Sequence, residues 1–516
     1  MNDQPLPSDP TRLPIVDIEL VLEGSYPFVT GGVSKWVHDL LEGLPQFSFG
    51  IIHLASRQEE KRTLRYQLPS NVHYLQNVYL HDPVFLYPAP EINPFKAGGF
   101  FPQLKSFHEN SHTMDGTGFA TLLKTLTADT HLPFIRNLFF CEPALDMLES
   151  MYLERNPDAS YIDFFWTWRY MHLPIIQLLQ ARRGPTGLVH TISTGYAGYY
   201  AALRKYTEGT PVILTEHGIY TRERNIEITQ AEWIHSEKQP DHLVRTTKGT
   251  FKKLWIEFFE TLGHWTYEAA DRIVTLFEGN RTEQIRLGAA PQKTMVIPNG
   301  ILPNVFLDLR PEAPPDPNAF HVGFVGRVVP IKDVATLLSA AQMCLMNHPQ
   351  ASFHIIGPLD EDPEYAREMR QFADTIKPAG RIFFHGRQNV REWYPKLDVC
   401  VLTSVSEGQP LSIMETMAAG IPTVTTDIGG CSELIFGRSA DDKALGPCGV
   451  VTSLRSPEQT AQGIAYVCAD PSRYLAMVRA GKKRVMQYYQ QSTLLESYSA
   501  LYTEFLSAME RRKRPR

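Results

Sequence analysis

Short β-rich runs alternate with helical stretches between residues 319 and 425, and this alternation restricts the possible fold more than any other feature of the sequence. The expected strands are Ala319–Val325, Ser352–Ile356, Arg381–Phe384, Leu397–Leu402 and Pro422–Thr425. Helices are expected over Lys332–Met346 and Pro363–Ile376, and from Leu411 onward. This order predicts an α/β fold whose parallel sheet has helices on both faces.

The amino-terminal half follows the same order less regularly. Its expected elements are a helix over Val33–Leu41 and strands at Ile15–Leu22, Gly187–Ile192, Pro211–Thr215 and Arg272–Thr275. Between Pro83 and Asp158 we expect a long, aromatic-rich, irregular insertion that carries contacts to an acceptor or a partner. Both halves are therefore predicted to be α/β domains.

A chain of 516 residues exceeds what one hydrophobic core usually serves, so at least two domains are expected. Candidate boundaries are Pro298-Asn299-Gly300 and Pro311–Pro317, where four prolines in seven residues oppose both helix and central strand. We predict domains at 1–305, including the insertion at 83–158, and at 306–485, with a C-terminal helix at 486–516 that packs back toward the first domain. Open α/β sheets bind ligands at the carboxyl ends of their strands, so a site is expected in a cleft between the domains.

Composition excludes several classes of protein. Lys and Arg number 50 against 56 Asp and Glu, and the net charge of −6 argues against broad nucleic-acid binding. The first residues, Met1 to Leu13, do not form a secretory signal, and no apolar run is long enough to span a membrane. Six scattered cysteines indicate reduced thiols in the cytoplasm. The basic tail Arg511–Arg516 is either a solvated end or a contact to anionic lipid or a membrane partner.

The first candidate site is Gly326-Arg327-Val328-Val329-Pro330-Ile331-Lys332-Asp333, which directly follows an expected strand and opens a helix. A glycine turn, two cations and a helix N-terminus meet there, and free N–H groups with the positive end of a helix dipole favour an anion. Arg327 and Lys332 add full charges, so a diphosphate is the natural ligand. The alternative is an ordinary loop whose Arg and Lys are surface charges. For Asp333, a cap of the following helix is the simpler role.

The second candidate site, Thr403 to Glu415, also follows a hydrophobic strand and leads into a helix. Glu407 and Glu415 are eight residues apart, ~12 Å along a continuous helix, which is too far for an acid/base pair that acts on one atom. They suit two ends of one long ligand, because carboxylates accept hydrogen bonds from the vicinal hydroxyls of a sugar and a ribose. Gly408 lets backbone N–H groups approach a phosphate closely. The alternative for Glu415 is a favourable charge at a helix N-terminus.

Two weaker candidates lie in the amino-terminal half. Gly31-Gly32, between the first strand and the first helix, can pass close to a phosphate or sugar, although a plain turn explains it equally well. His217, in Thr215-Glu216-His217-Gly218 at the end of a strand, can face a ligand or be a packed and satisfied histidine. Asp360-Glu361-Asp362 has a DxD pattern, but its position before Pro363 is better explained by helix capping than by a metal.

Together these residues resemble the retaining glycosyltransferases of family 4, which have a GT-B fold: two Rossmann-like domains with parallel sheets that face an interdomain cleft. The resemblance rests on Glu407 and Glu415 in E-x7-E, followed by Ala418-Ala419-Gly420-Ile421-Pro422, and on the G-R-x4-K spacing from Gly326 to Lys332. Three further segments are similar to the branch that makes Pel-type exopolysaccharide: Glu23–Pro27, Gly31–His38 and Thr215–Gly218. The likeness spans nearly the whole chain.

The resemblance implies transfer of a hexose or N-acetylhexosamine from a UDP-sugar to a growing exopolysaccharide in the cytoplasm. UDP-glucose is the favoured donor, an N-acetylhexosamine donor stays open, and no metal ion or other cofactor is expected. Retention without an obvious covalent nucleophile implies front-face displacement, in which the departing phosphate helps to take the proton of the acceptor. The implied partners are a glycan acceptor and an inner-membrane synthase complex that holds the protein peripherally.

The resemblance also assigns roles to matching residues. Arg327 and Lys332 would neutralise the departing diphosphate, Glu407 would contact the donor sugar, and His217 would reach donor and acceptor from the first domain. The backbone near Arg387 and Gln388 would read the uracil, and Glu415 would bind the ribose. The expected catalytic residues are Glu407, Arg327, Lys332 and His217, and the expected binding residues are Gly31, Gly32, Gly326, Arg387, Gln388, Gly408, Gln409, Pro410, Leu411 and Glu415.

Two other functions are compatible with parts of the sequence. A UDP-sugar epimerase on the same two-domain plan would need further acid/base groups around the sugar, and no convincing pair is present. A nucleotide-sugar-sensing or scaffolding subunit of a membrane polysaccharide synthase could keep the diphosphate site and dispense with Glu407, which this chain retains. A transferase is therefore the favoured interpretation.

Overall fold

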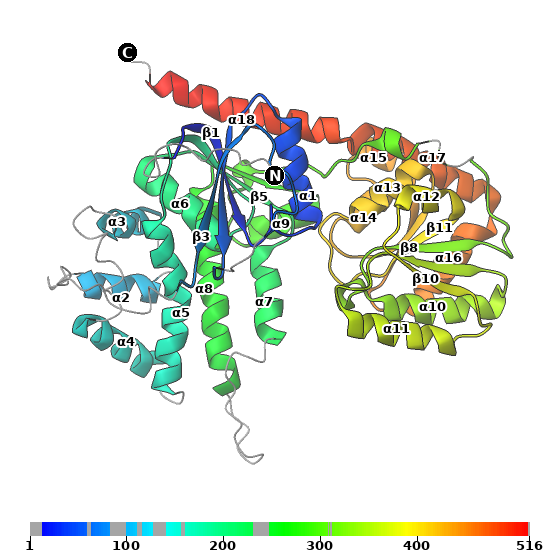
Figure 1. Ribbon diagram of the computed structural model, residues 1–516, viewed down its shortest axis with the longest axis horizontal. Helices are drawn as coiled ribbons and strands as arrows, with labels where there is room; N and C mark the ends of the chain where they lie inside the picture. Colours follow the sequence, from blue (N-terminus) through cyan, green and yellow to red (C-terminus); the bar gives the residue numbers. More distant parts are fainter. Residues whose placement is uncertain are drawn as a thin grey trace. The chain divides into compact units, whose positions relative to one another are not determined.

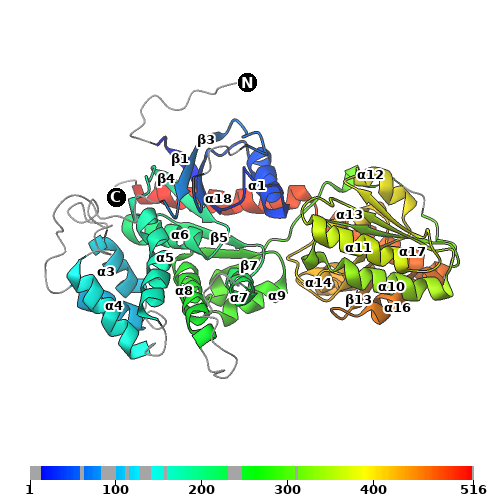
Figure 2. The same cartoon turned by 60° about the horizontal axis from the view of Figure 1, so that its bottom comes forward.

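The computed structural model describes residues 13–58, 63–82, 100–110, 116–126, 141–155, 160–230, 247–307, 309 and 312–513. By their internal contacts the residues form two compact units (Figures 1 and 2). The first unit comprises residues 1–274, 282–295 and 499–516, and the second comprises residues 275–281 and 296–498. The proline-rich stretch that was a candidate boundary belongs, by this division, to the second unit.

The first unit is built on a seven-stranded sheet with the order β3-β2-β1-β4-β5-β6-β7. Its strands are β1 (Val16–Glu23), β2 (Phe49–Ala55), β3 (Val72–Tyr79), β4 (Thr186–Thr191), β5 (Val212–Glu216), β6 (Arg272–Thr275) and β7 (Thr294–Val296). β1 pairs in parallel with β2 and β4, which confirms the predicted type of sheet. The predicted strands coincide with β1, β4, β5 and β6 to within one residue at each end, whereas β2, β3 and β7 were not predicted.

Seven helices accompany this sheet in the described part of the chain, besides those of the insertion. They are α1 (Gly32–Gly43), α5 (Tyr161–Gln180), α6 (Tyr196–Glu208), α7 (Tyr220–Gln230), α8 (Thr247–Ala269), α9 (Glu278–Arg286) and the C-terminal α18 (Gln491–Lys513). The division into units falls within α9 and within α18, whose residues from 499 onward belong to the first unit. There the Tyr502 hydroxyl lies 2.7 Å from Nδ1 of the buried His190.

The prediction that residues 83–158 are irregular is wrong for the described part of this segment, which forms three helices. These are α2 (Phe100–Asn110), α3 (Gly116–Leu126) and α4 (Glu142–Arg155), whereas residues 83–99, 111–115, 127–140 and 156–158 lie outside the described residues. α3 buries Phe119, Leu123 and Leu126, which recur at helical spacing. The helices are short, so each depends on packing with its neighbours rather than on its own propensity, and the sequence signal is weak.

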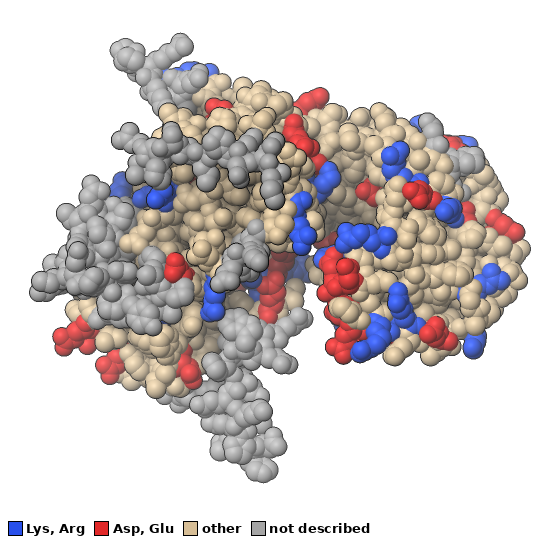
Figure 3. All heavy atoms as spheres, viewed as in Figure 1, with Lys and Arg blue, Asp and Glu red and all other residues tan. Residues whose placement is uncertain are grey.

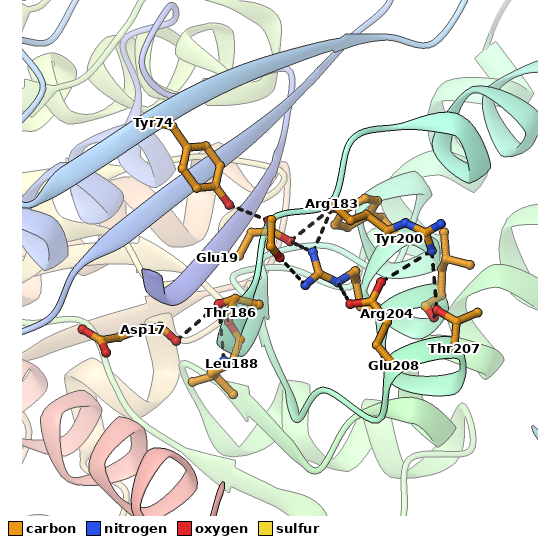
Figure 4. A network of polar contacts seen from close by, with 12 residues as sticks. Asp17, Glu19, Tyr74, Arg183, Thr186, Leu188, Tyr200, Arg204, Thr207 and Glu208 are labelled. Atoms are coloured by element: carbon orange, nitrogen blue, oxygen red, sulfur yellow. Dashed lines mark hydrogen bonds and ion pairs between the residues drawn. The ribbon is translucent and has the colours of Figure 1, made fainter. Parts of the chain in front are cut away.

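A buried ion pair fixes the first sheet to one of its helices (Figure 4). Nη1 of Arg204 on α6 lies 2.8 Å from the carboxylate of Glu19 on β1, and the two side chains are 1% and 0% exposed. The hydroxyls of Tyr74 and Tyr200 donate to the same carboxylate at 2.6 and 3.1 Å. Glu208 also pairs with the Arg204 guanidinium, at 2.9 Å. Every charge of the network therefore has a partner, as burial of a charge requires.

The second unit has a six-stranded sheet with the order β10-β9-β8-β11-β12-β13. Its strands are β8 (His321–Val325), β9 (Ser352–Ile356), β10 (Ile382–Gly386), β11 (Val399–Leu402), β12 (Thr423–Thr426) and β13 (Gly449–Thr452). The five predicted strands are confirmed to within two residues at each end, and β13 was not predicted. Alternate residues of β11 enter two different cores, Val399 and Val401 on one face and Cys400 and Leu402 on the other. This pattern shows a sheet covered on both faces.

The helices of the second unit are α10 (Val334–Asn347), α11 (Pro363–Thr375), α12 (Val390–Trp393), α13 (Leu411–Ala419), α14 (Cys431–Phe436), α15 (Ala440–Lys443), α16 (Pro457–Ala469) and α17 (Pro471–Tyr488). Single 3₁₀ turns occur at Pro291–Lys293 in the first unit, and at Pro303–Val305, Pro330–Lys332 and Tyr394–Lys396 in the second. The predicted C-terminal helix begins at Gln491 rather than at residue 486. The chain between α17 and α18 is instead held by Ile301, whose backbone bonds to Tyr489 and Gln491 at 2.9 and 2.7 Å.

Acidic and basic side chains are interspersed on the face that Figure 3 shows, rather than gathered by sign. Within the described residues, every helix falls short of the length and hydropathy that a membrane crossing demands. Of the predicted basic tail, residues 514–516 lie outside the described part of the chain.

Candidate functional site

In each sheet, successive strands are first added on one side of the starting strand and then on its other side. This reversal lies between β1 and β4 in the first unit and between β8 and β11 in the second. In open α/β sheets, ligands bind beyond the carboxyl ends of the strands at such a point. In the second unit, the two strongest sequence motifs follow β8 and β11 directly. The topology therefore places both motifs at the reversal point of one sheet.

Lys332 and Glu407 join these two loops. The ammonium of Lys332 forms an ion pair and hydrogen bond with Oε1 of Glu407, and the two side chains are only 16% and 12% exposed. The hydroxyl of Thr403 donates to the backbone oxygens of Lys332 and Asp333 at 3.1 and 2.9 Å. The Val405 N–H donates to Ile331 O at 2.9 Å. The predicted cation and the predicted sugar-binding carboxylate thus meet in one largely buried site.

Arg327 takes a different partner. Its Nη1 lies 2.8 Å from Oε2 of Glu361, and the two side chains are 53% and 38% exposed. The structure therefore does not bring the guanidinium of Arg327 onto the carboxylate that holds Lys332. Gly326, just before it, donates its N–H to Ile356 O at the end of β9, at 3.0 Å.

The expected helix N-terminus after Lys332 differs from the prediction. α10 begins at Val334, and Lys332 lies in a 3₁₀ turn before it. Asp333 caps α10 by accepting the Thr336 N–H at 3.2 Å, so a carboxylate already occupies this helix end. This confirms the capping alternative for Asp333. Asp362 likewise caps α11 by accepting the Tyr365 N–H at 3.0 Å, as predicted for the DxD segment.

The N-terminus of α13 is better suited to bind an anion than the capped N-terminus of α10. α13 begins at Leu411, directly after the Glu407–Gly408 loop, and Pro410 at its N-cap position gives it no side-chain cap. A helix N-terminus of this kind presents backbone N–H groups and a positive dipole end. Gln409, one of the predicted binding residues, is buried, and its Oε1 accepts the Asn299 N–H at 2.7 Å.

Glu415 lies one turn into α13 and is oriented by an aromatic hydroxyl. The phenol of the fully buried Tyr394 donates to its Oε2 at 2.7 Å. Each oxygen of a carboxylate can accept more than one hydrogen bond. Arg387 and Gln388 are exposed and follow β10, and Gln388 donates from Nε2 to His385 O at 2.9 Å. In the strand order, β10 is separated from β8 by β9.

A second diglycine supports the Glu407 loop and was not predicted. Gly429 and Gly430 follow β12, and the Gly430 N–H donates to Gly408 O at 2.7 Å. Gly429 has a φ of +57°, and a Cβ there would lie 2.2 Å from Glu407 O. Only glycine permits this approach. The sequence signal was available, because Gly429-Gly430 stands at a strand–helix junction like Gly31-Gly32.

In the first unit, Gly31 and Gly32 are exposed at the start of α1, with nothing within 4 Å of the Cβ that either would carry. His217 follows β5, and its ring meets that of Trp36 on α1 edge-on, with 4.8 Å between centroids. Burial lowers the pKa of His217 to about 4, so its imidazole is neutral at physiological pH. The diglycine helix and the predicted histidine are thereby brought together.

A cavity of 590 Å³, with mostly apolar walls and a few charged side chains, lies beyond the ends of β1 and β2 in the first unit. The carboxylate of Glu23 lines it and accepts the Tyr220 hydroxyl at 2.9 Å and the Ser193 hydroxyl at 3.2 Å. The Arg224 guanidinium lies 3.6 Å from Glu23 and 5.1 Å from the centroid of the Tyr220 ring. The aromatic walls include Tyr170, Tyr196, Trp255 and Phe259. Sequence reasoning named Glu23 only as part of a motif and missed the cavity, which depends on α5 and α8.

Among the residues that the structure describes, no group of three His, Cys, Asp or Glu side chains is arranged to hold a metal ion.

Two family models match the chain. Residues 16–292 match the family described as Domain of unknown function (DUF3492), and residues 319–470 match the family described as Glycosyl transferases group 1. The second match indicates a transferase.

The chain is also similar to curated proteins. Alpha-maltose-1-phosphate synthase of Mycolicibacterium smegmatis is 25% identical over 334 residues, which cover 61% of this chain and 77% of that protein. D-inositol 3-phosphate glycosyltransferase of Thermobispora bispora is 25% identical over 47% of this chain and 58% of its own length. The chain thus spans little more than half of this second relative.

Solved structures match nearly the whole chain. HepE (Alr3699) of Anabaena in complex with UDP and glucose has a TM-score of 0.54 at 13% identity, over 95% of this chain and 100% of that one. Sucrose-phosphate synthase of Thermosynechococcus elongatus has a TM-score of 0.55 at 16% identity, over 95% and 99% of the two chains. At this identity the likeness concerns the fold, and the chain has the α/β GT-B fold with two parallel sheets.

Proposed function

The chain belongs to the family described as Domain of unknown function (DUF3492), and we propose that it is a retaining glycosyltransferase that moves a hexose or N-acetylhexosamine from a UDP-sugar to a growing exopolysaccharide of the Pel type. The match of residues 319–470 to group 1 glycosyl transferases supports this class of activity. A structure of the similar protein HepE in complex with UDP-glucose supports UDP-glucose as the favoured donor. We further propose that the protein works in the cytoplasm with an inner-membrane synthase complex.

The observation that carries this proposal is the ion pair of Lys332 with Glu407 at the reversal point of the second sheet. The ammonium is held in a largely buried position by Glu407, which lies four residues before the first residue of α13. A cation and a helix N-terminus in one place stabilise the charge that develops on a departing diphosphate. Glu407, held by the same ammonium, supplies a carboxylate for hydroxyls of the donor sugar.

With the diphosphate at Lys332 and the sugar at Glu407, the other predicted residues have roles toward the remaining parts of the donor. Glu415, fixed by Tyr394, accepts hydrogen bonds from the ribose hydroxyls. Arg387 and Gln388 read the uracil from the loop after β10. Arg327 reaches the diphosphate by exchanging its exposed contact with Glu361 for a phosphate oxygen, because an exposed ion pair costs little to break.

The proposed reaction breaks the bond between the anomeric carbon and the diphosphate oxygen. The acceptor oxygen bonds to the same face of that carbon, and its proton passes to the departing phosphate. UDP and the extended glycan are the products. The protein binds, orients and excludes water in this scheme, and neutral His217 donates or accepts a hydrogen bond at the reacting sugars.

The cavity of 590 Å³ in the first unit is the proposed acceptor site. Its volume lies within the range of about 300–1,000 Å³ that small-molecule sites occupy. Glu23 accepts hydrogen bonds from sugar hydroxyls, and the aromatic rings of Trp255 and Phe259 pack against the apolar faces of sugar rings.

Calorimetric titration tests the donor assignment. UDP, ADP and GDP, and then a panel of UDP-sugars, are titrated into the wild type, Lys332→Ala and the control Lys443→Ala, which removes an exposed lysine of the second unit. We expect UDP to bind best, to bind much more weakly to Lys332→Ala, and to bind unchanged to the control. Equal binding of the three nucleotides would count decisively against the donor assignment.

Turnover distinguishes the enzyme from a sensor or scaffold. Release of UDP from UDP-glucose is followed with a saccharide acceptor for the wild type and Glu407→Ala. The transferase proposal expects turnover that the substitution abolishes while the fold and UDP binding persist. Tight binding without turnover by the wild type would favour the sensing or scaffolding function.

A further inference from the structure

An apolar pocket of 120 Å³, partly open to solvent, lies in the first unit, apart from the cavity near Glu23. Its lining comes from the insertion helices α2, α3 and α4 and from α5, α6 and α8, several of which Figure 2 shows together on one side of the unit. The described part of the insertion is thus one wall of this cavity.

The lining is formed by the inward faces of amphipathic helices. Phe119 and Leu123 contribute from α3, Trp168 and Met171 from α5, and Trp265 from α8. All five side chains are at least nine-tenths buried. Protein interiors pack closely and contain few voids larger than a water molecule. A void of this size among well-buried apolar side chains therefore calls for an explanation other than ordinary core packing.

An apolar cavity does not hold water, because a water molecule needs two to four polar partners. An engineered cavity of about 150 Å³ lined by Leu, Ile and Phe stays dry and binds benzene. The cavity at Trp168 is of similar size and lining chemistry. It therefore suits a hydrocarbon group as large as a benzene ring or a short alkyl chain.

One side of the cavity leads to water. Glu257 of α8 belongs to the lining, yet its side chain is 33% exposed and lies 3.6 Å from the ammonium of Lys253, which is 77% exposed. The polar head of a ligand would remain hydrated at this position while its apolar part enters between the helices.

The outer sides of α4 and α5 are also apolar. Leu153, Ile162 and Trp166 are 61%, 65% and 43% exposed. Ile162 and Trp166 are four residues apart and lie on one face of α5. Exposed apolar side chains of this kind attract hydrocarbon to the surface next to the cavity.

We propose that the insertion forms a binding site for the hydrocarbon chain of a single-chain amphiphile, which enters the cavity beside Glu257 and packs between Phe119 and Trp168. The proposal stands independently of the transferase assignment, because it concerns no residue of the sugar-binding sites.

Tryptophan fluorescence of the full-length protein tests the site, because Trp168 and Trp265 line the cavity and a bromine atom quenches tryptophan on contact. Brominated octanol is titrated below the concentration at which it aggregates. We expect saturable quenching that unbrominated octanol reverses and that potassium bromide does not reproduce. Quenching that grows without saturation would overturn the proposal.

Variants in which a larger side chain fills the cavity test whether the quenching arises from binding in the cavity. Leu123→Phe should abolish saturable quenching, whereas Leu145→Phe, which adds the same ring to a 41% exposed position on α4, should leave it unchanged. Ile175→Phe on α5 repeats the test if Leu123→Phe does not fold, as judged by circular dichroism. Saturable quenching that survives in a folded, filled variant would contradict the site.

Vesicles distinguish the source of the hydrocarbon. Brominated phosphatidylcholine vesicles are compared with monomeric brominated octanol. Quenching by the vesicles without quenching by the monomer would also overturn the proposal, since it would place tryptophans such as the exposed Trp166 against a bilayer instead of around a single chain.

Discussion

The ammonium of Lys332 is paired with the carboxylate of Glu407, 75 positions further along the chain. The contact links the loop after β8 to the loop after β11. Since both side chains are largely buried, each depends on the other for compensation of its charge. Lys332 and Glu407, which are assigned to different parts of the donor, are therefore energetically coupled, and this coupling can be measured.

A double-mutant cycle on this pair should show strong coupling. Lys332→Met leaves the Glu407 carboxylate without its cation, so both thermal stability and UDP affinity should fall. Glu407→Gln frees the ammonium for the diphosphate, so UDP binding should persist while turnover falls by about 10²–10³-fold, as on removal of one preorganised electrostatic contact. Calorimetry, product formation and thermal unfolding are measured for both single variants and the double variant. Additive losses of stability would disprove the coupling.

Arg327 and Glu361 should respond in opposite directions. Glu361→Gln releases the guanidinium and should tighten UDP binding severalfold, whereas Arg327→Gln should weaken it. Neither change should alter the unfolding free energy by more than about 1 kcal/mol, because exposed ion pairs contribute little. UDP titration and urea denaturation are the measurements. If both variants bind UDP like the wild type, Arg327 is only a surface charge.

Removal of Arg204 should destabilise the first unit strongly. Arg204→Met leaves Glu19 buried without its cation, and breaking a buried pair in this way costs about 3–5 kcal/mol. Its neighbour provides the control, because Lys205 pairs with Asp271 at 2.7 Å with both side chains about 30% exposed. Lys205→Met should cost no more than about 1 kcal/mol. If urea denaturation gives the two variants equal losses of unfolding free energy, burial does not determine the cost of breaking an ion pair.

Acid should destabilise the fold through its buried histidines. Burial lowers the pKa of His190 to about 3 and that of His217 to about 4. Between these values and about 6.5, the unfolded chain binds more protons than the folded one, so stability rises with pH. The stabilisation is complete above pH ~6.5 and is lost as pH falls toward 3. Glu223, whose pKa is raised by burial to about 7, contributes with the opposite sign between about 4.5 and 7.

The variant His190→Gln isolates one contribution to this pH dependence. The slope of unfolding free energy against pH between 4 and 6.5 should be smaller in the variant than in the wild type. Urea denaturation at several pH values measures the slope, and NMR of the imidazole protons reports whether His217 stays neutral at pH 6. An unchanged slope would mean that His190 titrates normally.

Most strands with strong apolar patterns were predicted from the sequence. The errors in these predictions have physical causes. β9 was predicted with its observed limits, because Ser352–Ile356 lies between a helix end and a glycine. β3 (VHYLQNVY) was missed because its polar residues resemble a loop, although its pairing with β2 makes it a strand. The helices of the insertion were missed because each is short, and their apolar faces acquire meaning only against α5, α6 and α8.

In the candidate site, too, some features could be predicted from the sequence and others could not. The spacing of Gly326, Lys332, Glu407 and Glu415 led to the prediction of a diphosphate and sugar site beyond a parallel sheet, because residue type and position after a strand are local properties. That site stays a prediction. Tertiary structure alone decided that Lys332 meets Glu407, that Arg327 meets Glu361, and that Gln409 is held by Asn299. It also decided that α13, not α10, presents an uncapped end. These choices depend on distances between loops far apart in the chain, and a linear sequence does not contain those distances.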